Sequence, residues 1–239
     1  MADFQLTSSR HENTDLFSGR SFYPIVPFNP VRDKLLSMDF TESNTELTAE
    51  LLENEPAFCQ YVEVKINQAG ALYGIGGYSE HRTVYRRSRV FDDPNGGEPR
   101  RLHLGVDIWG IAGTPVFTPM SAVVHSLQFN NHFGDYGATI ILQHELRGQP
   151  FFTLYGHLSL PDLELSPGQI LNEGQEFAHF GRPEENGHWP PHLHFQIIWD
   201  MQGKTGDYPG VCRFSEREQY LLHCPDPDLI LNMNRYLAQ

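Results

Sequence analysis

Histidine and aspartate side chains stand at two places in the sequence with the types and spacing of a metal site. The stretch RLHLGVDIWG carries His103 and Asp107, and PPHLHFQII carries His192 and His194. If both stretches are strands, residues i and i+4, like residues i and i+2, point to the same side. Two such strands lying side by side would bring three or four ligand-type groups to one point. Two neutral imidazoles and one carboxylate leave an open coordination position, which is the composition of a catalytic zinc site rather than a closed structural one.

Other interpretations of these residues stay open on spacing alone. A His-x-His pair in a β protein is more often packed or solvent-facing than bound to a metal. Non-haem iron oxygenases also use two histidines and a carboxylate, but one residue usually separates their His and Asp, whereas three intervene here. A structural zinc site would favour a cysteine ligand, and the sequence has none near these motifs. Six of the twelve histidines fall between positions 144 and 194, and this density favours a metal site.

The elements that must position these groups are strands. Residues 101–200 contain short apolar runs, such as ATIILQH and FFTLYGHL, separated about every ten residues by Gly, Pro, Asn and Asp. This rhythm is typical of a compact antiparallel β sandwich or barrel. We therefore predict a mainly β core with N- and C-terminal extensions that carry short helices.

The segment before the core predicts a different organisation. The prolines of FYPIVPFNP, residues 22–30, exclude regular helix and central strand, so we expect an extended segment whose aromatic side chains pack on the β core. This segment would act either as a structural brace or as a lid across the cleft. SNTELTAELLENEP predicts a short helix capped by Ser43 or Asn44 and stopped by Pro56, and a strand-like pattern begins at Tyr61.

The segment after Gly203 predicts one helix in SEREQYLLHC and an extended docking segment in PDPDLILNM. The predicted organisation is therefore an N-terminal extension packing on the core (1–60), a strand-rich lead-in (61–100), a catalytic core (101–203) and a C-terminal tail (204–239).

Composition excludes several classes of function. Seventeen Lys and Arg against thirty Asp and Glu give a net charge of −13, which disfavours nucleic acid or an anionic membrane as the main partner. No apolar run approaches the roughly 18 residues of a transmembrane helix. The first twenty residues lack the basic and apolar regions of a secretory signal, and the three cysteines show no CxxC pair. These features predict reduced thiols and a cytoplasmic location.

Three motifs in the core, HLGVDIWG, TLYGHLS and PPHLHFQI, resemble the signatures of the lysostaphin-type zinc metalloendopeptidases, which cleave peptidoglycan. GTPVFTPMSAVVHSL, GDYGATIILQHE and LSPGQILNEGQEFAHFG are similar to further parts of the same family. The resemblance covers residues 101 to 200 and implies the family's duplicated hybrid motif fold. Together with GDYPGV and CPDPDLIL, the core also resembles metallopeptidase-like domains fused to aminotransferases and phosphotransferases.

The resemblance implies a role for each motif residue. His103, Asp107 and His194 would hold one Zn²⁺ per chain, and His157 and His192 would be unliganded catalytic groups. A zinc-activated water and histidine acid–base assistance would then hydrolyse an amide bond. The residues do not indicate which histidine is the general base, which bond is cleaved or how many chains associate.

Three functions are consistent with these features. The first is a metalloendopeptidase that cleaves a peptidoglycan-type peptide. The second is a zinc hydrolase of a soluble cytoplasmic amide or muropeptide. The third is a regulatory domain without turnover, which the presence of all five motif residues disfavours.

Overall fold

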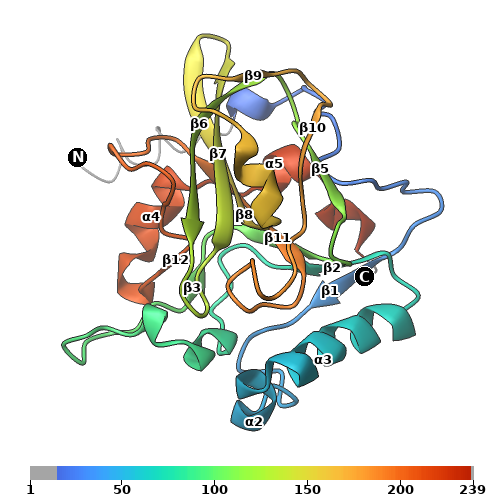
Figure 1. The fold of residues 1–239 in the computed structure, drawn as a ribbon, viewed down its shortest axis with the longest axis vertical. Coiled ribbons are helices and arrows are strands. Elements are labelled where there is room, and N and C mark those ends of the chain that lie inside the picture. The colour runs from blue at the N-terminus through green and yellow to red at the C-terminus, as the bar shows by residue number, and fades with distance from the viewer. Residues whose placement is uncertain (1–14, 238–239) are drawn as a thin grey trace.

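The computed structural model describes residues 15–237, and a single large sheet dominates it (Figure 1). Its strand order is β1-β2-β4-β11-β8-β7-β6-β9; β1 and β2 are parallel, and the other neighbours are antiparallel. Two small sheets, β10-β5 and β12-β3, complete the β structure. The strands are β1 (Leu35–Met38), β2 (Tyr73–Gly76), β3 (Leu102–His103), β4 (Val106–Trp109), β5 (Pro115–Phe117), β6 (Ala122–Asn130), β7 (Gly137–Leu146), β8 (Gln149–Leu158), β9 (Ile170–Leu171), β10 (Glu176–His179), β11 (His192–Ile198) and β12 (Val211–Cys212). This architecture confirms the predicted mainly β, antiparallel core.

The central strands separate two chemically different faces of the sheet, as period-2 alternation requires. On β11, Leu193, Phe195 and Ile197 belong to the main hydrophobic core. The alternate residues His192 and His194 point to the opposite face, where the candidate site lies. The alternation that the sequence shows in HLHFQII therefore sets which face carries chemistry.

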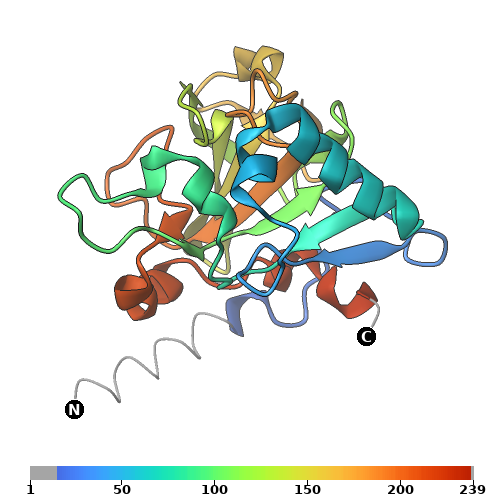
Figure 2. The ribbon, with the colours of Figure 1, turned by 90° about the horizontal axis from the view of Figure 1, so that it is seen from below.

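The helices are short, apart from α3, and lie at the ends of the chain. They are α2 (Ala49–Glu53), α3 (Glu55–Gln68), α4 (Arg217–His223) and α5 (Asp228–Leu231), with 3-10 turns η1 (Asp15–Phe17), η2 (Val84–Arg87), η3 (Arg89–Phe91), η4 (Leu160–Glu164), η5 (Phe214–Glu216) and η6 (Asn234–Tyr236). In Figure 2, α2, α3 and the segment that carries η2 and η3 lie on one side of the sheet. Ile230 of α5 belongs to the main core on the other face. Each of these helices is too short or too polar to cross a membrane.

The strand-rich lead-in predicted for residues 61–100 is wrong in its secondary structure. Helix α3 continues to Gln68, and between 61 and 100 only β2 is a named strand. Phe58, Val62 and Ile66 are spaced by four residues and all three are buried, so a helical period competes with the local alternation.

Pro56 does not stop the first helix; it stands in the first turn of α3, where its missing N–H leaves no intrahelical bond unmade. Thr48, rather than Ser43 or Asn44, caps α2. The predicted helix in the tail is confirmed as α4, whereas PDPDLILNM is not extended, because it contains α5.

The proline-spaced segment forms neither helix nor strand, as its prolines predict, and it packs on the core. Ile25 and Val26 are buried in the main core, and Phe22 and Phe28 are partly buried against it. The ring of Tyr23 lies 5.8 Å from that of Phe117. Part of the predicted extension, residues 1–14, lies outside the described residues, as do residues 238–239.

Candidate metal centre

Strand register brings the predicted site residues together. His194 on β11 stands opposite Asp107 on β4 and, on its other side, opposite Gly156 on β8. His103 does not share a strand with Asp107, because β3 ends at His103 and β4 begins only at Val106. Strand β3 pairs instead with β12. The expected single strand from His103 through Asp107 is therefore wrong, although the two side chains still converge.

Gly105 lies in the short link between β3 and β4, where the backbone passes close to the ring of His194. A Cβ atom added there would lie 2.5 Å from Cε1 of His194 and 2.8 Å from the Phe195 carbonyl oxygen. A side chain at this position would therefore displace the ring of His194. The glycine in HLGVD is explained by this close approach.

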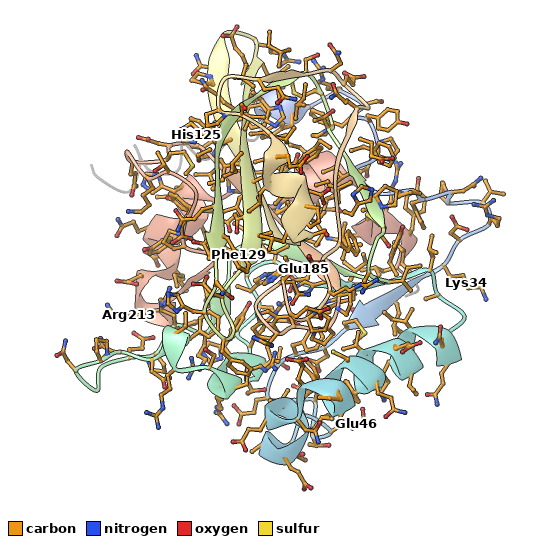
Figure 3. All side chains as sticks on the ribbon, in the orientation of Figure 1. Lys34, Glu46, His125, Phe129, Glu185 and Arg213 are labelled. Carbon is orange, nitrogen blue, oxygen red and sulfur yellow. The ribbon has the colours of Figure 1, made fainter. Side chains whose placement is uncertain are left out.

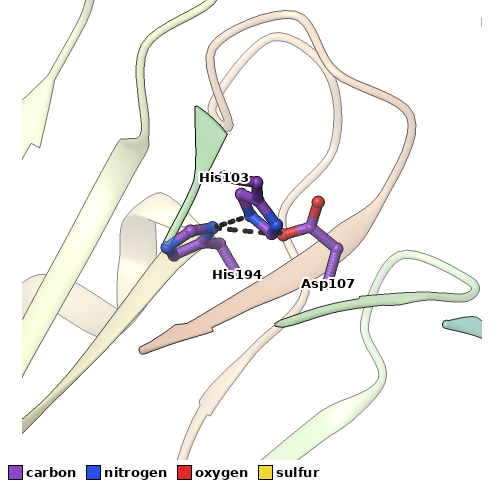
Figure 4. A group of neighbouring side chains, drawn as sticks. All are labelled: His103, Asp107 and His194. Carbon is purple, nitrogen blue, oxygen red and sulfur yellow. Dashed lines mark hydrogen bonds and ion pairs between the residues drawn. The ribbon is translucent and has the colours of Figure 1, made fainter. Parts of the chain in front are cut away.

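Three ligand atoms face one another at nearly equal distances (Figure 4). His194 Nδ1 lies 3.0 Å from His103 Nε2 and 3.1 Å from Asp107 Oδ1, and His103 Nε2 lies 3.2 Å from the same oxygen. A tetrahedral zinc with bonds of about 2.0–2.1 Å separates its ligand atoms by roughly 3.3 Å. The three atoms therefore already have the spacing that such an ion requires.

In each of the two imidazole rings, the nitrogen that points away from the cluster makes a hydrogen bond. This bond fixes which ring nitrogen carries the proton. His103 Nδ1 donates to the Gly77 carbonyl at 2.9 Å, which leaves its Nε2 with a lone pair. His194 Nε2 donates to Gln196 Oε1 at 3.0 Å, and the Gln196 amide in turn donates to the Pro209 carbonyl, so Nδ1 of His194 is also an acceptor. Such outer partners orient metal ligands in proteins.

Arg82 holds the third ligand. Its Nη1 donates to Asp107 Oδ2 at 2.5 Å and its Nε donates to Glu80 at 2.6 Å, while the Arg82 side chain is 1% exposed. This leaves Asp107 Oδ1 directed at the two histidines. Three acceptors then face one another without a proton between them, an arrangement that a cation would stabilise. The donor set and its spacing fit a zinc ion.

The electrostatics of the site keep these groups in their ligand forms. Burial lowers the pKa of His103 to about 4, so the imidazole is neutral at pH 7. Burial opposes ionisation of Asp107, but the interactions with His103 and with the Arg82 guanidinium outweigh it and hold the pKa of the carboxyl well below its ordinary value. A neutral imidazole and an ionised carboxylate are the states that bind metals.

His157 and His192 lie beside the three candidate ligands. Their rings stack with centroids 4.1 Å apart, and His192 Nε2 lies 4.0 Å from Asp107 Oδ1. His157 Nδ1 donates to the Asn186 carbonyl at 2.7 Å, and His192 Nδ1 donates to the Pro190 carbonyl at 2.8 Å. Each therefore keeps an acceptor Nε2. Burial lowers the pKa of both rings, that of His192 to about 4.

The backbone at His157 is strained, because its φ is +63°, in the left-handed region that a non-glycine residue seldom adopts. Such conformations cluster at functional sites, where the surrounding structure holds them. The Asn186 carbonyl and the stacked His192 ring supply that support here.

Tyr136 is a further residue of the site, although its sequence context, GDYG, is typical of a turn. Its buried ring lies 5.1 Å from that of His194 and 5.6 Å from that of His157, with the hydroxyl 3.5 Å from His194 Nε2. Burial raises its pKa well above the ordinary value, so the phenol stays a proton donor. Sequence spacing could not reveal this residue, because β7 and β8 must pair before it approaches the histidines.

Two other histidines between positions 144 and 194 lie outside the candidate site. His144 is buried and accepts from Thr153 Oγ1 at 2.7 Å, in a packing role. His188 pairs with Glu55 at 2.6 Å and does not line the site cavity. Trp189, next to it, does line the cavity.

Residues 77–100, here called the covering segment, close one side of the site. The metal-type ligands are 0–3% exposed, and His157 and His192 are 6% and 2% exposed. The Gly77 carbonyl and Arg82 belong to this segment, and it also contributes Val84, Tyr85, Val90, Phe91 and Arg100 to a cavity of ≈ 140 Å³. None of the residues 15–76 lines that cavity. The extended segment at residues 22–30 therefore lies away from the cleft, in the position of a brace.

Comparison with known proteins shows a family match over the part of the chain that carries the candidate ligands. Residues 101–207 match the model of Peptidase family M23. This segment, which contains His103, Asp107 and His194, thus matches an M23 peptidase domain, and the resemblance to the lysostaphin-type family is confirmed.

Three individual proteins illustrate the similarity. The chain is 30% identical over 148 residues to the L-Ala–D-Glu endopeptidase of Bacillus subtilis, covering 58% of this chain and 43% of that protein. It is 28% identical over 179 residues to an uncharacterized metalloprotease of Haemophilus influenzae, covering 69% and 35%. The catalytic domain of lysostaphin from Staphylococcus simulans is 19% identical, with a TM-score of 0.39, covering 67% of this chain and 97% of that domain. The chain spans less than half the length of the two curated relatives.

Proposed function

We propose that this protein is a zinc-dependent endopeptidase that hydrolyses an amide bond in a peptidoglycan-type peptide. The observation that carries the proposal is the set of three acceptor atoms, from His103, Asp107 and His194, that lie 3.0–3.2 Å from one another. The M23 match and a relative named for the L-Ala–D-Glu bond support a peptide substrate. A bound Zn²⁺ would act as a Lewis acid and lower the pKa of water toward 7.

The chain's own residues would handle the protons. Nε2 of His157 and Nε2 of His192 are acceptors beside the ligand cluster, held by carbonyl partners on their Nδ1 atoms. One of them would take a proton from the attacking water and deliver it to the leaving amine. The Tyr136 hydroxyl, which keeps its proton, would donate to the oxygen that gains charge as the amide carbonyl is attacked.

A second substrate class is favoured by the burial of the site. The three ligands are 0–3% exposed and the covering segment lies against them, whereas an assembled cell-wall polymer requires an open groove. A soluble peptide or muropeptide would enter such a cavity more easily. A cytoplasmic location, which cell fractionation would test, would agree with this substrate.

One experiment tests the function and separates the two substrates. Metal content is measured on the purified protein by mass spectrometry, followed by digestion of purified peptidoglycan and of soluble muropeptides with mass analysis of the products. We expect about one zinc per chain and a new amine terminus in at least one digest. Release from intact peptidoglycan supports the first substrate, and products from muropeptides alone support the second. A protein that carries stoichiometric zinc and cleaves neither would contradict the proposed activity.

A further inference from the structure

The cavity beside the ligand cluster has two chemically different sides. One side is polar and carries Asp107, His157, His192 and His194. The other is a continuous apolar wall made by Val84, Tyr85, Val90, Phe91 and Val211. All five residues of this apolar wall lie outside residues 101–207, the part of the chain that matches the M23 model.

The apolar wall is held in place by its own packing. The rings of Tyr85 and Phe91 lie 4.5 Å apart, and Val211 stands opposite His103 in the β3–β12 pair. Val84, Tyr85, Phe91 and Val211 are 2–7% exposed and belong to one hydrophobic cluster with Trp109 and Trp189.

Polar bonds fasten the covering segment to the C-terminal part of the chain. Arg213, labelled in Figure 3 beside this segment, donates to Asp93 at 2.5 Å and to the Glu98 carbonyl at 3.0 Å. Arg100 donates to the Val90 carbonyl and lies over the Phe91 ring. The wall is therefore a preformed surface, as ligand pockets in proteins usually are.

The charged groups that border the cavity beside the wall are already engaged or exposed, whereas the buried indole N–H groups of Trp109 and Trp189 have no hydrogen-bond partner. Arg82 is paired with Asp107 and Glu80, and its Nη1 is 3.4 Å from the Tyr85 hydroxyl. Asp135 accepts from the Tyr136 amide at 2.8 Å, and Asp207 is exposed. The apolar wall itself offers little to a charged ligand group, whereas it can remove an aliphatic or aromatic group from water.

The size of the cavity limits what it can take. Its volume is ≈ 140 Å³. An apolar protein cavity of about 150 Å³ takes up a single benzene molecule. There is room for one leucine-sized side chain beside the ligand cluster, and not for a larger or polymeric group.

We propose that the apolar wall is a specificity subsite for one uncharged aliphatic side chain of a short peptide, next to the amide that is cleaved. This inference rests on the proposed hydrolase function and narrows its substrate class. Burying a side chain of this size distinguishes it from glycine by roughly 10–100-fold in binding.

Binding of amino-acid hydroxamates to the zinc-loaded protein tests the subsite independently of turnover. A hydroxamate binds zinc and presents a single side chain beside it, so calorimetry with the glycine, leucine and aspartate compounds compares three side chains in one position. We expect the leucine compound to bind at least about 10-fold more tightly than the other two. Equal affinities, tightest binding of the aspartate compound, or binding of none of the three would overturn the proposal.

Two variants and a control locate the effect on the apolar wall. Val90→Phe fills the cavity and should reduce the leucine preference to less than about threefold. Val211→Ala enlarges the cavity and should shift the preference toward phenylalanine hydroxamate, which is added to the series as a fourth compound. Val31→Phe introduces the same Val-to-Phe substitution at a position that is 95% exposed, and it should leave the leucine preference intact. Unchanged preferences in both cavity variants would contradict the assignment. If leucine hydroxamate binds preferentially but no peptide is cleaved, the proposed activity fails while the subsite stands.

Discussion

At the scale of single residues, the site depends on groups that orient the ligands as much as on the ligands. Asp107 has two oxygens, and Arg82 engages Oδ2, so only Oδ1 faces the histidines. Gln196 likewise engages Nε2 of His194 and leaves Nδ1 free. The ligand types follow from motifs such as HLGVD and HLH. Their partners do not, because Arg82 and Gly77 come from a separate segment and approach only after folding.

The first prediction separates ligands from catalytic groups. His194→Ala removes one of three ligands, so it should lose zinc and activity together. His157→Ala and His192→Ala should keep zinc, because their Nδ1 atoms bond to backbone carbonyls and neither belongs to the ligand cluster. Both should lose roughly 100-fold or more in kcat, the scale of a positioned acid–base group. Metal analysis and steady-state kinetics on a verified substrate make the comparison.

The control for this series is His132→Ala, at an exposed position. His144, a histidine of the same dense region, is unsuitable because it is buried and hydrogen-bonded to Thr153, so its removal would disturb the core. Full activity of His157→Ala, or loss of zinc from His192→Ala, would show that the roles implied by the motifs are misassigned.

At the scale of elements, the alternation of apolar and polar residues predicted the strands of the core, whereas the helical periodicity of α3 was missed. The alternation in HLHFQII sets β11 with two histidines on one face and apolar residues on the other. In YVEVKI the same alternation is misleading, because Phe58, Val62 and Ile66 form a buried helical stripe that begins before Tyr61. The register that places His194 opposite Asp107 depends on pairing between strands 87 residues apart, which no local pattern specifies.

The second prediction concerns the segment before β1 and distinguishes a brace from a lid. Deleting residues 1–34 removes Phe17, Ile25 and Val26 from the main core, where they are 4%, 3% and 1% exposed. We expect lower solubility and a lower melting temperature, without any rise in activity, because none of the residues 15–34 lines the site cavity. A milder variant, Ile25→Ala, should cost about 2–5 kcal/mol of unfolding free energy.

Thermal unfolding and zinc content would be measured for both variants, with Val31→Ala as the exposed control. Ile25→Ala should retain zinc, because its side chain packs on the face of the sheet opposite the ligands. A stable deletion variant with higher turnover than the full chain would instead support a lid.

At the scale of the whole molecule, histidine burial makes stability depend on pH. Burial lowers the pKa of His144 to about 4, and this ring is remote from the metal ligands, with Ser121 and Thr153 as its partners. An unfolded chain binds a proton at this residue near pH 6.5, whereas the folded chain does not until about pH 4. The stabilising contribution is thus fully present above pH 6.5 and is lost as the pH falls toward 4.

The third prediction follows from the lowered pKa of His144. Between pH 7 and pH 5, His144 alone should lower the free energy of unfolding by on the order of 2 kcal/mol, since one pKa unit corresponds to about 1.4 kcal/mol. His144→Gln, which lacks a titrating ring, should be less stable than the parent chain at pH 7 but lose less stability on acidification. Urea unfolding at pH 7, 6 and 5, with a chelator to remove differences in metal occupancy, measures both slopes. His132→Gln, at an exposed position, should keep the parent slope. Identical slopes for His144→Gln and the parent chain would mean that His144 does not resist protonation in the folded state, and that its burial is not a source of acid sensitivity.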